Sequence, residues 1–63
     1  MRYKIVAKLP TGRVLVTGKG RHKSYKDKHV AEQIALDFSN KKSDWKFRVV
    51  EEDVNIEYVF NDV

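Results

Sequence analysis

The sequence predicts an α+β domain in the order β-β-α-β-β, with one helix packed on one face of a four-stranded, mainly antiparallel sheet and the other face open. Three observations indicate this class. Three segments alternate with a period of two, a fourth short segment rich in valine follows a turn-like sequence, and one segment repeats apolar residues at four-residue spacing. The chain has 63 residues, which is enough for a single hydrophobic core. One domain is therefore expected over residues 1–63.

The first two predicted strands form a hairpin. In the first strand, over residues 1–9, the apolar side chains that share one face are Tyr3, Ile5, Ala7 and Leu9. The sequence PTG that follows fits a three-residue connection, because Gly12 can adopt the left-handed conformation that closes it. In the second strand, over about residues 13–18, the side chains expected to face the helix are Val14 and Val16.

The helix is expected to begin near Tyr25. Ser24 stands three residues before Asp27, a spacing that resembles a capping box with aspartate in place of glutamate. The side chains expected to form the buried stripe are Val30, Ile34 and Phe38. The polar residues 39–44 are expected to end the helix.

Two further alternating segments predict the third and fourth strands. The side chains of the third strand expected to face the helix are Trp45, Phe47 and Val49. A turn at the acidic residues 51–53 leads to a fourth strand whose buried side chains are expected to be Val54, Ile56, Tyr58 and Phe60. If this last strand lies beside the first, Lys4 or Lys8 comes close to Glu57.

Composition and charge limit the classes of function. The chain has no cysteine and no apolar run long enough to span a membrane, so we expect a cytoplasmic protein without disulfides and without a membrane partner. The net charge of +4 is unevenly distributed, because residues 1–28 carry +8 and residues 29–63 carry −4. This asymmetry indicates either a surface for an anionic partner or neutralisation of one half by the other.

A basic loop, residues 18–29, leads into the helix. Its candidate anion- or nucleic-acid-binding residues are Lys19, Arg21, Lys23, Lys26 and Lys28. The amino end of a helix attracts anions, and basic side chains around it strengthen that attraction. The loop is not a nucleotide-binding P-loop, because five residues rather than four separate Gly12 from Gly18, and Lys19 is followed by Gly20. A site for an anion and a merely solvated loop both remain open.

The open face of the sheet is the second candidate surface. Its apolar residues, expected to contact a protein partner or a second copy, are Val6, Leu15, Val50 and Val59. The alternative is that these are scattered surface residues. Every strand aromatic is assigned to the covered face, so stacking of nucleic-acid bases on the open face is not expected.

Catalytic, cofactor and metal sites are not expected. His22 and His29 are seven residues apart, which matches no common pair of metal ligands, and no serine or lysine has a base placed beside it. The sequence therefore predicts a non-catalytic binding module that acts through protein contact or homodimerisation on the open sheet face. The alternative is a nucleic-acid-binding module that uses the basic amino-terminal half. In size, composition and element order the chain is similar to short lysine-rich reading frames of phages and prophages, a likeness that assigns no residue a role.

Overall fold

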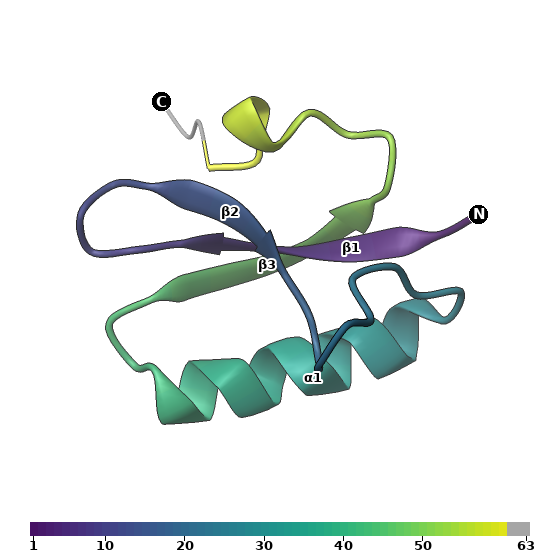
Figure 1. The fold of residues 1–63 in the computed structure, drawn as a ribbon, viewed down its shortest axis with the longest axis horizontal. Coiled ribbons are helices and arrows are strands. Elements are labelled where there is room, and N and C mark those ends of the chain that lie inside the picture. Colours follow the sequence, from purple (N-terminus) through teal and green to yellow (C-terminus); the bar gives the residue numbers. More distant parts are fainter. Residues whose placement is uncertain (61–63) are drawn as a thin grey trace.

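Within residues 1–60, three strands form one antiparallel sheet, and the α-helix packs on one of its faces (Figure 1). The computed structural model describes residues 1–60. Its elements in chain order are β1 (Tyr3–Lys8), β2 (Val14–Thr17), α1 (Lys28–Lys41), β3 (Lys46–Glu51) and the short 3-10 helix η1 (Ile56–Tyr58). The α+β class expected from the sequence is confirmed, with three strands among the described residues rather than four.

β1 is the central strand of the order β2-β1-β3. Leu9 donates its backbone N–H to the carbonyl of Arg13 on one side (2.8 Å), and Glu52 donates to the carbonyl of Arg2 on the other (2.9 Å). Hydrogen-bonded pairs alternate along an antiparallel ladder, so the odd residues of β1 bond toward β2 and the even residues bond toward β3. β2 and β3 are consequently the two edges of the sheet.

The connection between β1 and β2 is the predicted three-residue turn. Gly12 has a φ of 93° and donates its N–H to the carbonyl of Leu9 at 2.9 Å. The turn pairs Leu9 with Arg13, so each odd-numbered residue of β1 lies opposite an odd-numbered residue of β2, and Ala7 lies opposite Leu15. Directly opposite residues place their side chains on the same face of the sheet. The expected facing of β2 is therefore wrong: Leu15 lies on the helix side, and Val14 and Val16 lie on the other.

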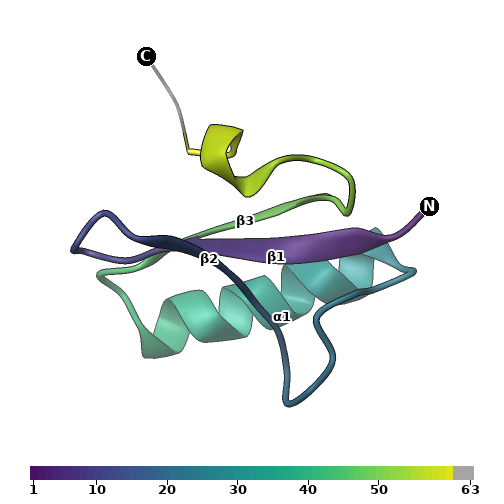
Figure 2. The same cartoon turned by 45° about the horizontal axis from the view of Figure 1, so that its top comes forward.

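The predicted fourth strand is also wrong. Val54 donates its N–H to the carbonyl of Glu51 (3.0 Å), which turns the chain out of the sheet after β3. The side chain of Asn55 then accepts from the N–H of Glu57 at 3.0 Å and caps η1. Residues 54–60 cross the face of the sheet opposite α1 instead of extending its edge (Figures 1 and 2).

α1 begins later than expected. Asp27 is its N-cap and accepts from the N–H of His29 at 2.8 Å, while Ser24 lies outside the helix in the preceding loop. At the other end, the N–H of Lys42 bonds to the carbonyl of Phe38 at 2.8 Å.

Two alanines form the fully buried part of the helix. Ala31 and Ala35 pack with Ile5 and Tyr25, and the helix lies against β3 and β1. Small side chains at these positions allow the helix to approach the sheet closely. The helix therefore presents its two alanines to the sheet, and the predicted stripe of Val30, Ile34 and Phe38 lies to one side of the helix–sheet contact. Ile34 is only half-buried, and Val30 is 45% exposed.

Candidate functional site

The basic loop is an ordered structure anchored by Tyr25. The Tyr25 side chain is buried, and its hydroxyl accepts from the N–H of Lys19 (2.9 Å) and donates to the carbonyl of His22 (2.5 Å). The backbone of Tyr25 pairs with that of Tyr3 through two hydrogen bonds of 2.7 and 2.9 Å. The turn that carries Lys19 and His22 is thus fixed to the end of β1.

Gly18 is required where this turn closes. A Cβ atom at this position would lie 1.9 Å from the carbonyl oxygen of His22 and 2.8 Å from the hydroxyl of Tyr25. Only glycine permits such a close approach of the two backbone segments. Gly18 therefore shapes the start of the basic loop.

A second set of bonds holds the loop to the sheet. Arg2 donates through Nε to the Ser24 hydroxyl (2.6 Å) and through Nη2 to the Ser24 carbonyl (3.2 Å), while the Ser24 hydroxyl donates to the Glu52 carboxylate. Arg2 and Glu52 form an ion pair at 3.9 Å. Half-exposed ion pairs contribute little stability. The value of this cluster lies in tying three distant segments of the chain together.

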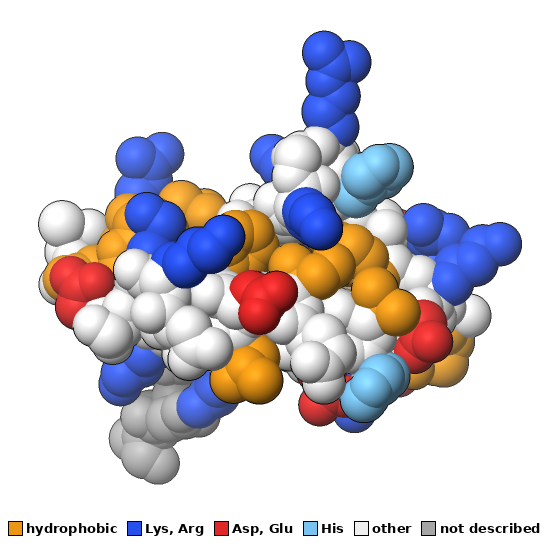
Figure 3. Space-filling view, turned by 90° about the horizontal axis from the view of Figure 1, so that it is seen from below, with side chains coloured by type: hydrophobic (Ala, Val, Ile, Leu, Met, Phe, Trp, Pro, Cys, Tyr) orange, Lys and Arg blue, Asp and Glu red, His pale blue; other side chains and the backbone are white. Residues whose placement is uncertain are grey.

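The structure separates the five basic candidates. Lys19, Arg21 and Lys23 lie on the exposed turn, whereas Lys26 immediately precedes the N-cap. Lys28, the first helical residue, lines a hollow beside β3. On the helix side of the molecule, Lys and Arg side chains lie in several separate groups rather than in one patch (Figure 3).

The four residues expected to form an apolar strip do not share an exposed face. Val6 and Val59 are buried, with 0% and 7% exposure, because residues 54–60 cover this side of the sheet. Val50 faces the same side and is half-buried, whereas Leu15 lies on the helix side. The sheet face that the sequence left open is thus occupied in part by the chain itself.

Two basic side chains hold this covering segment. Lys4 donates to the carbonyl of Val54, and Arg48 donates to the carbonyl of Val59 at 2.7 Å. The Arg48 guanidinium also lies over the ring of Phe60, 5.1 Å from its centroid. Lys4 was expected to lie near Glu57 if the fourth strand formed beside the first. Its ammonium group instead bonds to the backbone carbonyl of Val54.

The outer edge of β3 offers backbone groups to a partner. The backbone N–H of Glu52 donates to the backbone carbonyl of Arg2. The even-numbered residues of β3 therefore direct their N–H and carbonyl groups toward β1. Phe47 and Val49 must then direct theirs away from the sheet. Among residues 1–60 no strand lies on that side of β3. An edge of this kind is a template for another strand.

A shallow hollow of about 310 Å³ runs beside this edge on the helix side. The residues that line it are Lys28, Glu32 and Ala35 of α1 and Phe47 and Val49 of β3. The hollow is therefore lined by three apolar side chains together with one positive and one negative side chain.

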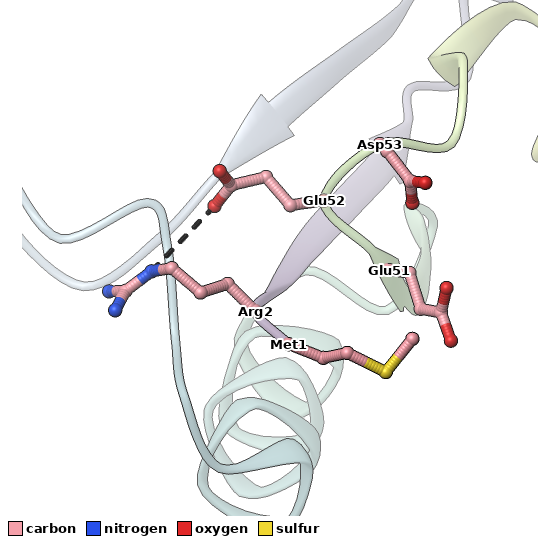
Figure 4. Close-up of a pocket in the computed structure, with 5 residues that line it drawn as sticks. All are labelled: Met1, Arg2, Glu51, Glu52 and Asp53. Carbon is pink, nitrogen blue, oxygen red and sulfur yellow. Dashed lines mark ion pairs between the residues drawn. The ribbon is translucent and has the colours of Figure 1, made fainter.

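A second hollow, of about 320 Å³, lies at the start of the chain and is lined by Met1, Arg2, Glu51, Glu52 and Asp53 (Figure 4). Arg2 turns toward Glu52, whereas Glu51 and Asp53 lie on the other side of the hollow. The carbonyl of Glu51 accepts from Val54 in the expected turn. Within the described part of the chain, no three histidine or acidic side chains come together as metal ligands would.

No known protein family, curated protein or solved structure significantly matches this chain. None of the helices within residues 1–60 has the length and apolar character needed to cross a bilayer.

The edge of β3 is the candidate site that sequence reasoning missed. The alternation of residues 45–50 predicted a strand that the structure places at Lys46–Glu51, but the edge position depends on the loss of the fourth strand. Asn55 and the turn at Glu51 were the available signals, because both disfavour continued sheet pairing.

Proposed function

We propose that the chain is a non-catalytic protein-binding module whose partner adds a strand to the outer edge of β3. The observation that supports this proposal is the outward direction of the Phe47 and Val49 backbone groups beside a hollow lined by α1. Strand addition supplies affinity through main-chain hydrogen bonds and specificity through alternate side chains. Protein contact was also the function expected from the sequence. The proposed binding surface is now the outer edge of β3 instead of the open face of the sheet.

The test removes a backbone donor that pairing between β1 and β3 does not use. Proline at position 49 deletes an N–H that points away from β1, and proline is tolerated at such edge positions. Strand-forming peptides selected from a random display library against the natural chain should lose binding to Val49→Pro. Val14→Pro is the matched control, because Val14 holds the corresponding outward position on β2.

Both variants should retain the circular dichroism spectrum of the natural chain. Binding that persists in Val49→Pro, or a library that yields no β3-dependent binder, would contradict the proposal. Binding that disappears equally in Val14→Pro would show that it depends on general integrity of the sheet and would also count against it.

A nucleic-acid-binding function is the second candidate, supported by the anchoring of the basic turn. Because Tyr25 fixes the turn, Lys19, Arg21 and Lys23 are presented on one ordered projection. Reversing all three charges to glutamate should abolish retention on heparin or DNA at low salt. If the three contact phosphates, the slope of log affinity against log salt should also fall by roughly three.

The control for this second test changes the net charge by the same amount at positions away from the basic turn. It reverses Lys8, Lys41 and Lys42, which lie outside the basic turn. Equal losses in the two triple variants would indicate non-specific attraction to a chain of net charge +4. Absence of retention by the natural chain would eliminate the candidate.

A further inference from the structure

The charges of β3 are arranged with opposite signs at its two ends. The segment reads KFRVVEED, with Lys46 and Arg48 at its start and three acids from Glu51 onward. An antiparallel copy of the same segment would place the basic end of each strand beside the acidic end of the other. We infer that the strand added to β3 is β3 of a second copy of this chain; this inference rests on the proposed function.

The direction of the backbone groups restricts how two β3 strands can pair. Within β3, Phe47, Val49 and Glu51 direct their backbone groups outward, and the Glu51 carbonyl also accepts from the N–H of Val54; each of the three must face another odd residue. A two-fold axis at Val49 satisfies this condition and sets Phe47 opposite Glu51 of the second copy. The same register places Lys46 opposite Glu52 of the second copy at a non-hydrogen-bonded position, where side chains approach most closely.

Two neighbouring registers are less favourable. A two-fold axis at Arg48 sets two guanidinium groups directly opposite each other, and like charges at such positions are destabilising. An axis at Val50 would pair Phe47 with Asp53, which lies beyond the last backbone bond to β1, from Glu52 to Arg2, and inside the turn closed by Val54. The Val49 register uses the strand as far as it remains in the sheet.

The surroundings of the edge are compatible with this pairing. The side of α1 next to the hollow carries Ala35 together with the oppositely charged Lys28 and Glu32. Two-fold symmetry would bring this side of one helix toward the same side of the other. Lys46 is exposed, and the side chain of Glu52 is 52% exposed, with its Oε2 atom engaged by Ser24 and Arg2 and its other carboxylate oxygen left to meet Lys46 of a second copy.

Charge reversal tests both the pairing and its register by sedimentation over a range of concentrations. In a homodimer, Lys46→Glu places two carboxylates opposite each other, and Glu52→Lys places two ammonium groups opposite each other. Each variant alone should dimerise at least roughly tenfold more weakly than the natural chain. An equimolar mixture of the two variants should recover association, because the mixed dimer restores an opposite-charge arrangement that neither variant has alone.

Lys41→Glu is the control for net charge, since Lys41 lies at the end of α1, and it should leave dimerisation unchanged. Glu52→Lys also removes the partner of Arg2 and Ser24, so its fold must be verified. Should that variant unfold, amide exchange of the natural chain provides the test. The N–H groups of Phe47 and Val49 should become protected as concentration rises, whereas Lys46 and Arg48 should not change.

A natural chain that is monomeric at millimolar concentration would overturn the second-copy inference, as would a mixture of variants that fails to associate. Neither result bears on the peptide selection with Val49→Pro, so the failure of this inference is distinguishable from failure of the proposed function.

Discussion

Replacing Tyr25 with phenylalanine removes one oxygen atom from the base of the basic loop and should lower the melting temperature substantially. The hydroxyl is both an acceptor for the N–H of Lys19 and a donor to the carbonyl of His22. The ring itself, which is 8% exposed, would remain in place. The substitution therefore isolates the two hydrogen bonds from the apolar packing.

The expected cost follows from those two bonds. A hydrogen bond within a protein contributes about 1 kcal/mol net, and a partner left buried and unpaired adds to the cost of its removal. Two bonds give about 2 kcal/mol. In a domain of this size 1 kcal/mol corresponds to a shift of about 4–8 °C, so the melting temperature should fall by about 8–16 °C.

Thermal unfolding followed by circular dichroism measures this change. Tyr58→Phe is the matched control, because the Tyr58 side chain is 67% exposed, and its melting temperature should remain within about 2 °C of the natural value. A Tyr25→Phe variant as stable as this control would refute the reasoning. The loop would then be held by something other than the tyrosine hydroxyl.

Two further substitutions test the packing. Gly18→Ala should destabilise the chain by about 1–3 kcal/mol in denaturant titration, because its Cβ would collide with a backbone carbonyl, whereas Lys19→Ala at the exposed neighbouring position should have little effect. Val6→Ala should cost about 2 kcal/mol if residues 54–60 cover the sheet as described, whereas Val30→Ala should be neutral or slightly stabilising, since alanine favours helices. Equal stability of the two valine variants would contradict the burial of Val6.

Local patterns predicted the first hairpin and the third strand well. The period of two over β1 and β3, together with Gly12 in the turn, depends on neighbouring residues only, and all three appear where expected. The facing of β2 failed because it depends on how the turn pairs Leu9 with Arg13. A change of one residue in that pairing exchanges the two faces of the strand.

Long-range packing decided the features that the sequence did not predict. Ser24 has the spacing of a helix cap, but Arg2 and Glu52 engage it from distant parts of the chain, and Asp27 caps the helix instead. Residues 54–60 alternate as a strand does, but the Asn55 cap and the bonds from Lys4 and Arg48 hold them across the sheet. The five basic candidates lie close together in sequence, but Lys19, Arg21 and Lys23 belong to the turn, whereas Lys28 is the first residue of α1 and lines the hollow beside β3.

The central position of β1 has a consequence for how the chain folds during synthesis. β1 is made before both of its neighbours, and its pairing with β3 joins Tyr3 to Glu51. Until residue 51 has left the ribosome, one side of β1 lacks hydrogen-bond partners, and Val6 stays uncovered until Val59 follows. Within the sheet, β1 can pair early with β2 alone, and a two-stranded hairpin is marginally stable. A nascent chain stalled before residue 51 should therefore be sensitive to proteases, and it should become resistant only after β3 emerges.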